Sequence, residues 1–216
     1  MWLASLADEL RVVRSDEDVA YVTKLFEQAT GDYVCPRVWT QWLQFALQQL
    51  PADLTSPSSS AVVESTRRLF ERAIVAVGCH PVHGGDIWDR YRTFEDLVAT
   101  ALADTATRAP PHTRDDLVKA KGRWLKLFTR QLQHPLQGNE KVLEEVKALP
   151  PSEVLAAAGF AKLVKDAEKA HAAAQLMLKQ RAPLERLLQA VHDRLTSASD
   201  VDKGAEKNKL LSTWKA

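Results

Sequence analysis

The sequence has few of the residues that cross-link a chain or interrupt helices. It contains 2 cysteines and 8 glycines among 216 residues. Two cysteines are too few for a disulfide framework, so the sequence favours a reducing compartment. Asn-Gly and Asp-Gly hairpin turns are absent, and alternating apolar and polar runs are scarce. Because Ala, Leu, Lys, Glu, Gln and Arg dominate instead, the sequence predicts an all-α chain.

Long apolar runs and a large excess of either charge are also missing. The apolar runs fall far short of the ~20 residues that a membrane span needs, and the first residues do not form a signal peptide. The formal net charge is +1, so bulk electrostatics demand no polyanionic partner. Phosphate-binding loops, nucleophile elbows, zincin motifs and paired catalytic carboxylates are not found. We therefore expect no enzymatic activity, no cofactor and no metal.

A two-part pattern is present twice, with its parts in the same order. The first part is LFE-x-A, at residues 25–29 and again at 69–73. The second part is a triplet of aromatic residues spaced three apart. The triplets are Trp39, Trp42 and Phe45, and then Trp88, Tyr91 and Phe94, with Glu95 following. A helix pair that recurs predicts a right-handed α-solenoid of antiparallel helix pairs, a fold that mostly serves as a binding scaffold.

The aromatic triplets are interpreted as core rather than as a surface that stacks bases or flavins. Residues three apart share one helix face, so each triplet forms a stripe that must pack against another helix. The helix with Leu69, Phe70 and Ala73 is the nearest partner, and the small alanine allows close approach. Two interpretations stay open for the glutamates Glu27, Glu71 and Glu95. They are exposed charges, or Glu95 bonds a neighbouring repeat and fixes its register.

Proline and glycine clusters divide the chain into about ten predicted helices. Their ranges are 2–11, 16–29, 36–49, 60–77, 86–102, 114–133, 138–148, 152–179, 183–195 and 205–214. Asp86 is a plausible N-cap for the fifth. The Pro-Ser stretch at 51–60 is interpreted as a loop within one solenoid, because the repeat continues in phase across it. The abrupt start at Trp2, already inside a repeat, predicts a fragment of a longer protein.

The second copy of the pattern resembles the half-a-tetratricopeptide (HAT) repeat of RNA-processing proteins. Three ordered strings resemble the N-terminal HAT region of spliceosomal small nuclear ribonucleoprotein recycling factors. They are LFEQATGDYVCPRVW (25–39), LFERAIVAVGCHPVHGGDIWDRYRTFE (69–95) and LFTRQLQHPL (127–136). Ser5 stands where that family has an aromatic residue, and the match is weak after residue 136. The predicted domains are HAT repeats at 1–136, with about three helix pairs, and a degenerate continuation of the same solenoid at 137–216.

The resemblance implies a non-enzymatic protein-interaction scaffold in the nucleus, in pre-mRNA splicing and the assembly or recycling of small nuclear ribonucleoproteins. It implies proteins of spliceosomal ribonucleoproteins as partners, with ubiquitin-specific proteases as further candidates. RNA binding is expected to be weak or indirect, membrane binding is not expected, and a homodimer would form through regions outside this fragment. The sequence itself contains no RNA-recognition domain motif.

One helix carries a candidate binding surface, which we call the basic stripe. It consists of Lys119, Arg123, Lys126 and Arg130, spaced 4-3-4. Such a stripe can bind an acidic protein partner or the phosphates of RNA, and a solvated helix face is the simpler alternative. Direct RNA binding through this helix is therefore the alternative function.

A cluster of possible metal ligands lies between the two parts of the second copy. Cys79, His80 and His83 fall within five residues, and Cys35 occupies the equivalent loop of the first copy. A structural zinc site needs four ligands, usually with two closely spaced cysteines. The pattern lacks that spacing and favours a partly buried loop between repeats.

Overall fold

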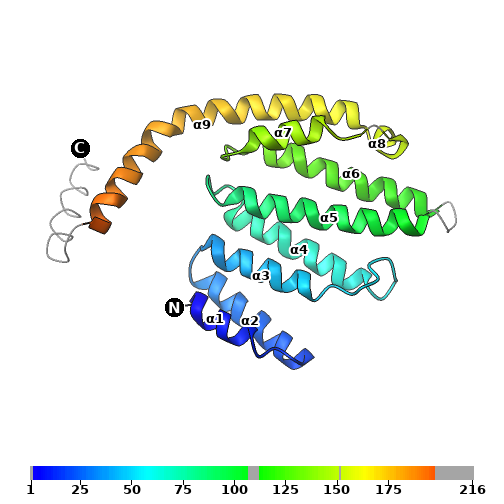
Figure 1. Ribbon diagram of the computed structural model, residues 1–216, viewed down its shortest axis with the longest axis horizontal. Coiled ribbons are helices and arrows are strands. Elements are labelled where there is room, and N and C mark those ends of the chain that lie inside the picture. The colour runs from blue at the N-terminus through cyan, green and yellow to red at the C-terminus, as the bar shows by residue number, and fades with distance from the viewer. Residues whose placement is uncertain (1, 107–111, 151, 198–216) are drawn as a thin grey trace. The chain divides into compact units, whose positions relative to one another are not determined.

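The computed structural model describes residues 2–106, 112–150 and 152–197 (Figure 1). Within these ranges the regular structure is helical and contains no strand, which confirms the all-α fold class. The chain divides into two units, residues 1–174 and 175–216. In the described part of the chain, no helix combines the length and the apolar character needed to cross a membrane.

The first unit is a series of helices that pack mainly on their neighbours in the chain. They are α1 (Trp2–Leu10), α2 (Asp16–Asp32), α3 (Pro36–Gln48), α4 (Ser60–Val77), α5 (Gly84–Ala106), α6 (His112–Leu132), α7 (Asn139–Lys147), α8 (Glu153–Ala157) and the start of α9 (Phe160–Ser197). The main helix contacts join elements one or two apart in this order, and α3 to α6 lie side by side in Figure 1. Packing between successive helices is typical of repeat proteins. The right-handed solenoid stays a prediction.

Local sequence explains where the early helices begin. Ser15 caps α2 by accepting a hydrogen bond from the Asp18 backbone N–H at 3.2 Å, and the Asp18 carboxylate accepts one from the Ser15 N–H at 3.0 Å. This reciprocal pair is a capping box. Pro36 occupies the first turn of α3, where its missing N–H leaves no helical hydrogen bond unmade.

Several predicted helix ends were placed a few residues from the observed ones. Helix α2 continues through Gly31 to Asp32 instead of ending at residue 29. Helix α5 starts at Gly84, so Asp86 lies in its first turn and is not the N-cap. A Cβ atom at residue 84 would lie 2.5 Å from the Gly78 carbonyl oxygen, which explains why this close turn requires glycine.

Most residues of the predicted helices at 152–179 and 183–195 are helical, but the boundaries between these helices were wrong. Helix α8 ends before Gly159, which has a φ of +81° and so takes a conformation that other residues rarely adopt. Helix α9 then runs through Pro183, although an interior proline removes one helical hydrogen bond and crowds the carbonyl four residues earlier. The helix predicted at 205–214 lies outside the described residues.

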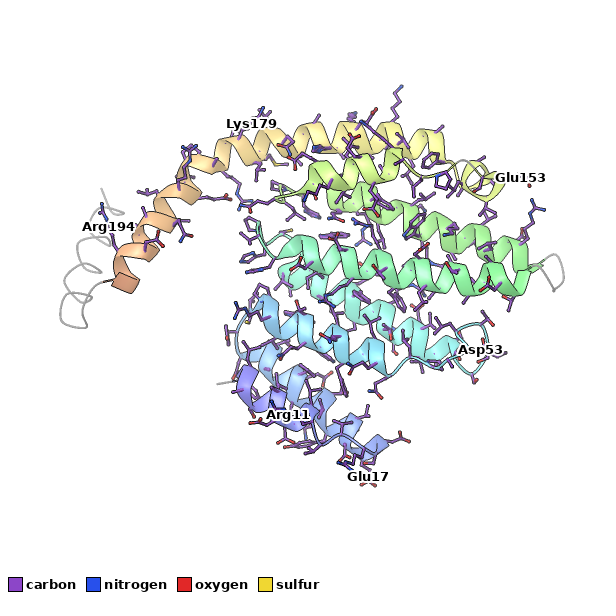
Figure 2. All side chains as sticks on the ribbon, in the orientation of Figure 1. Arg11, Glu17, Asp53, Glu153, Lys179 and Arg194 are labelled. Atoms are coloured by element: carbon purple, nitrogen blue, oxygen red, sulfur yellow. The ribbon has the colours of Figure 1, made fainter. Side chains whose placement is uncertain are left out.

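The aromatic triplets of both copies are buried in one hydrophobic core, together with Leu69, Phe70 and Ala73. Phe26 of α2 stacks on Trp42 of α3, with ring centroids 5.7 Å apart. Phe70 of α4 stacks on Tyr91 of α5 at 4.8 Å, so the same contact recurs in both copies. Side chains fill the spaces between these helices in Figure 2. Each LFE helix therefore packs against the aromatic helix that follows it.

A second hydrophobic cluster lies in the later part of the first unit. Its buried members are Trp124, Leu125, Phe128, Leu132, Val142, Val146, Leu155 and Ala167. The cluster joins α6 to α7, α8 and the start of α9, so packing within this unit continues past residue 136. The division of domains at residue 136 stays a prediction. In the second unit, the described part of α9 exposes large apolar side chains, among them Leu184, Leu187 and Leu188.

Candidate protein-interaction face

Two arginines at the same position of the repeat reach back to the preceding LFE helix. Arg72 of α4 and Arg130 of α6 both stand three residues after the leucine that opens the pattern. Nη1 and Nη2 of Arg130 donate to Oε1 and Oε2 of Glu71, each at 2.7 Å. Arg72 Nη1 lies 3.8 Å from Oε1 of Glu27, the equivalent glutamate of α2. We call these pairs the first rung (Glu27–Arg72) and the second rung (Glu71–Arg130) of an arginine–glutamate ladder.

Both ladder arginines also lie over tryptophans of the preceding aromatic helix. The Arg72 Cζ atom is 4.9 Å from the ring centroid of Trp42 and 5.9 Å from that of Trp39. The Arg130 Cζ atom is 5.3 Å from the ring centroid of Trp88. A guanidinium at such a distance gains a cation–π attraction in addition to its ion pair. The ladder therefore ties α2, α4 and α6 together and covers buried indole rings of α3 and α5.

The second rung is the more complete of the two. Glu71 accepts a hydrogen bond from the Tyr91 hydroxyl at 3.0 Å as well as the two from Arg130. Hydrogen bonds from Arg130 lower the pKa of Glu71, and those same bonds raise the pKa of Arg130. Burial, followed by the negative charge of Glu71, raises the pKa of Tyr91. All three groups thus keep their ordinary charge states near neutral pH.

Glu95 forms a second junction between helices, where the aromatic triplet ends. Its side chain is 1% exposed. It accepts hydrogen bonds from Arg67 of α4 at 2.5 and 3.1 Å, and Arg123 Nε of α6 lies 3.6 Å away. Burial alone would lower the pKa of Arg67, but its bonds to Glu95 and Glu64 outweigh that effect and raise it. Of the two interpretations of Glu95, the structure supports the inter-helix bond.

The basic stripe of α6 is partly neutralised by carboxylates of the same chain. Lys119 pairs with Asp116 at 3.4 Å, Arg123 approaches Glu95, and Arg130 belongs to the second rung. Lys126 is exposed and, within the described ranges, has no hydrogen-bond or ion-pair partner. The four cations share a helix but differ in their availability to a partner. Their role in binding stays a prediction.

The ladder was not found from the sequence, although a signal for it exists. In both LFERA (69–73) and LFTRQ (127–131), an arginine stands two positions after the phenylalanine. Glu27 and Glu71 also stand at one shared position. An arginine and a glutamate that recur at fixed positions of a repeat predict an inter-repeat pair, because equivalent positions of neighbouring repeats lie close together.

Two hollows lie between α2 and α4, and Glu27 and Arg72 of the first rung line both. The larger, which we call the Trp39 hollow, has a volume of about 500 Å³, and its wall includes Thr30, Gly31, Trp39, Glu71, Val75 and Ala76. The smaller, which we call the Phe45 hollow, has a volume of about 270 Å³, and its wall includes Val19, Trp42, Phe45, Val62 and Leu69. Both are open depressions with mainly apolar walls and a charged pair at their shared border.

The cysteine and histidines considered as metal ligands have other neighbours. Cys79 Sγ lies 3.4 Å from Nδ1 of His134, and the rings of His80 and His83 lie 4.9 Å apart. Burial, with a smaller effect of Arg130, lowers the pKa of His134. Cys35 stands just before α3. Among the described residues, no three His, Cys, Asp or Glu side chains are grouped in a way that could hold a metal ion.

The described residues thus form an all-helical protein with ion pairs between equivalent positions of α2, α4 and α6. The chain is similar to spliceosome associated factor 3, U4/U6 recycling protein, of Mus musculus, with 31% identity over 145 residues. The Homo sapiens protein is 30% identical over 145 residues, and the Danio rerio protein is 34% identical over 146. Each match covers 67% of this chain. The resemblance predicted from the sequence motifs is thus confirmed, and the chain is a relative of these recycling proteins.

The chain spans only a small part of the relatives it matches. It covers 13% of the mouse and human proteins and 15% of the Danio rerio protein. No family model matches the chain.

Proposed function

We propose that this chain is a non-enzymatic protein-interaction scaffold in nuclear pre-mRNA splicing. In this role it contributes to the assembly or recycling of small nuclear ribonucleoproteins. The observation that carries the proposal is its similarity, over two thirds of its length, to proteins named U4/U6 recycling proteins. Because the chain spans 13–15% of those relatives, we assign it one binding task rather than the activity of a whole recycling factor.

The arrangement of charged groups supports a scaffold. The second rung and the Glu95 junction link α4, α5 and α6 through bonds between side chains, and the first rung brings Arg72 of α4 to 3.8 Å from Glu27 of α2. Both rungs are about half exposed, so they border a surface that a partner can reach. A rigid helical face with charged borders and apolar hollows suits the binding of proteins.

Direct RNA binding has less support, because carboxylates of the same chain engage most of the basic stripe. Arg123 and Arg130 are held by Glu95 and Glu71, which leaves Lys126 and the loosely paired Lys119 for phosphates. Four phosphate contacts on single-stranded RNA would give a log–log salt slope of about −3, and two contacts about −1.4. We expect a shallow slope and no sequence preference in a filter-binding assay with oligouridylate. Nanomolar, sequence-selective binding at physiological salt would favour the RNA alternative.

A capture experiment from nuclear extract tests the scaffold directly. The tagged chain is incubated with extract, with and without ribonuclease, and the retained proteins are identified by mass spectrometry. We expect proteins of spliceosomal ribonucleoproteins to be enriched over beads carrying the tag alone, and to remain after ribonuclease treatment. Capture that ribonuclease abolishes would show that RNA is the primary ligand. Absence of such proteins from the untreated sample would contradict the proposal.

A further inference from the structure

The two rungs of the ladder are equivalent in sequence but unequal in bonding. In the second rung, the Glu71 carboxylate accepts bonds from Arg130 and from the Tyr91 hydroxyl. In the first rung, Glu27 and Arg72 approach only to 3.8 Å. Within the described ranges, the Glu27 carboxylate accepts no hydrogen bond and the Arg72 guanidinium donates none. The first rung therefore presents a negative acceptor and a positive donor side by side, both half exposed.

The tryptophan beside the first rung also lacks a bond that its counterpart makes. Trp88 Nε1 donates to the Gly78 carbonyl at 3.0 Å, whereas Trp39 Nε1 is buried and has no acceptor among the described residues. The sequence explains the difference. Ala29 and Trp39 are 10 positions apart, but the equivalent Ala73 and Trp88 are 15 apart, so the first loop is shorter by 5 residues. Trp39, 5% exposed, forms part of the wall of the Trp39 hollow.

We propose that the two hollows beside the first rung bind an extended, uncharged peptide segment of a protein partner. In this arrangement, apolar side chains of the segment enter the Trp39 hollow and the Phe45 hollow. An amide between them donates its N–H to Glu27 and accepts from Arg72 through its C=O. The inference rests on the proposed function, because it names the chemical class of partner that the scaffold binds.

The charges select an amide over an ion. A carboxylate that bonded Arg72 would come next to Glu27, and an ammonium or guanidinium that bonded Glu27 would come next to Arg72. Either arrangement places like charges together, which costs affinity. A main-chain or Asn/Gln amide carries one donor and one acceptor and is neutral, so it suits both members of the rung. Hydrogen bonds to charged groups are also stronger than neutral ones.

The size and the walls of the hollows agree with this occupant. Pockets that bind ligands measure about 300–1,000 Å³, so the Trp39 hollow, at about 500 Å³, lies within that range. The Phe45 hollow, at about 270 Å³, suits a single apolar side chain. Val75 in the wall is 87% exposed, an apolar surface that a peptide would cover. Peptides that lie in apolar grooves gain affinity from such side chains and specificity from the polar contacts.

Gly31 is a position where a larger side chain can block the Trp39 hollow without straining the helix. A Cβ atom at Gly31 would meet nothing within 4 Å, and the same holds for Gly122 of α6. Leucine at either position replaces a helical glycine and so favours the helix. Gly31→Leu therefore obstructs the hollow in a folded protein, and Gly122→Leu is its matched control. Arg72→Ala removes the donor of the first rung, with Arg68→Ala on the same helix as its control.

The test begins with a phage library of random short linear peptides, selected on the wild-type chain. We expect uncharged sequences with apolar residues to be enriched. The most enriched peptide, synthesised with a fluorescent label, should bind Gly31→Leu and Arg72→Ala at least about tenfold more weakly than wild type. Gly122→Leu and Arg68→Ala should bind as the wild type does. Circular-dichroism melts test whether each variant is folded. If Arg72→Ala does not fold, the result for Gly31→Leu decides the outcome.

Several results would overturn the inference. They are failure to enrich any peptide, enrichment of acidic or basic peptides as a class, or unchanged affinity in folded Gly31→Leu. If labelled oligouridylate binds the wild-type chain but not Gly31→Leu, the hollow is a nucleotide site instead. The nuclear-extract capture separates this inference from the proposed function. If the wild-type chain captures spliceosomal proteins but Gly31→Leu binds the peptide as tightly as wild type, only the peptide site in the hollows is rejected. If Gly31→Leu loses peptide affinity but the wild-type chain captures no spliceosomal proteins, only the splicing role is rejected.

Discussion

Arg130 and Glu71 form a two-point ion pair between α6 and α4, with both guanidinium nitrogens 2.7 Å from the carboxylate oxygens. Two parallel hydrogen bonds fix the relative position of the two side chains more strictly than a single contact does. Arg130 also covers the ring of Trp88. One residue thus links α6 to the LFE helix α4 and covers a ring of the aromatic helix α5.

We predict a measurable coupling between Arg130 and Glu71. A double-mutant cycle with Arg130→Ala and Glu71→Ala should give an interaction free energy of about 0.5–1 kcal/mol, because both side chains are about 40% exposed and partly screened. Urea unfolding provides the measurement. The pair Arg114–Glu153 is the control, since its N and O atoms lie 2.9 Å apart but both side chains are mostly exposed (Glu153 is labelled in Figure 2). Equal coupling in the two pairs would contradict the prediction.

Glu95 should contribute more to the free energy of unfolding than any exposed pair does. Glu95→Ala leaves the largely buried guanidinium of Arg67 without its main partner, so we expect a loss of about 3 kcal/mol. Glu64→Ala removes the exposed partner of the same arginine and should cost under about 1 kcal/mol. Chemical denaturation of both variants tests this ordering. Similar losses would show that Glu95 does not organise the junction.

Trp88 should be required for folding rather than for binding. Its ring is fully buried and its Nε1 donates to Gly78, so truncation removes both packing and a hydrogen bond. Trp88→Ala should cost about 3–5 kcal/mol or unfold the chain. Val75→Ala, at a position 87% exposed, should change stability by less than about 0.5 kcal/mol. A melting temperature of Trp88→Ala within a degree or two of wild type would refute this.

The sequence was sufficient for features that depend on local spacing. The aromatic triplets and LFE segments predicted helices with one apolar face, because helical periodicity is a property of neighbouring residues. The consequences of Gly159 and Pro183 were misjudged. Gly159 interrupts the predicted helix because the chain adopts a positive φ there, whereas α9 continues through Pro183 although a proline removes a helical hydrogen bond.

The candidate face was less predictable, because its contacts join distant parts of the chain. The spacing of the basic stripe was visible, but the partners of Arg123 and Arg130 lie on other helices. Whether a cation is free or paired depends on how those helices pack. The Trp39 hollow and the Phe45 hollow are lined by residues of α2, α3 and α4 together, which no single motif encodes.

Stability should decrease as the pH falls through about 6.5, the ordinary pKa of histidine in an unfolded chain. Burial, with Arg130 adding, lowers the pKa of His134, so the folded chain takes up this proton only at lower pH. At a pH between the pKa of His134 in the folded chain and its pKa in the unfolded chain, the unfolded chain binds more protons. A fall in pH through this range therefore favours unfolding. His80 acts in the same direction, because burial and His83 lower its pKa.

The measurement is the midpoint of urea unfolding at about pH 7.5 and about pH 5.5. His134→Gln should reduce the difference between the two midpoints, and the remainder should come from His80. The surroundings of His134 include Cys79 and the ring of Trp88, whose centroid is 5.4 Å from that of the imidazole. A pH dependence that is unchanged in His134→Gln would contradict the assignment.

The last prediction concerns the two members of the basic stripe that remain most available. Lys119 and Lys126 are exposed, and exposed charges usually contribute less than about 1 kcal/mol to folding. The double variant Lys119→Glu, Lys126→Glu should therefore melt close to the wild type. If an acidic partner binds α6, charge reversal slows association and reduces its dependence on salt. We expect the folded variant to lose affinity for acidic proteins captured from nuclear extract.

The control is the double variant Lys24→Glu, Arg68→Glu, which reverses two exposed cations on α2 and α4 and so changes net charge equally. If both variants lose the same partners, the effect follows net charge and not the stripe. If the α6 variant is folded and retains every wild-type partner, the stripe is a solvated helix face. If the α6 variant loses partners and the control variant does not, the acidic partner binds α6. That site is then separate from the hollows between α2 and α4.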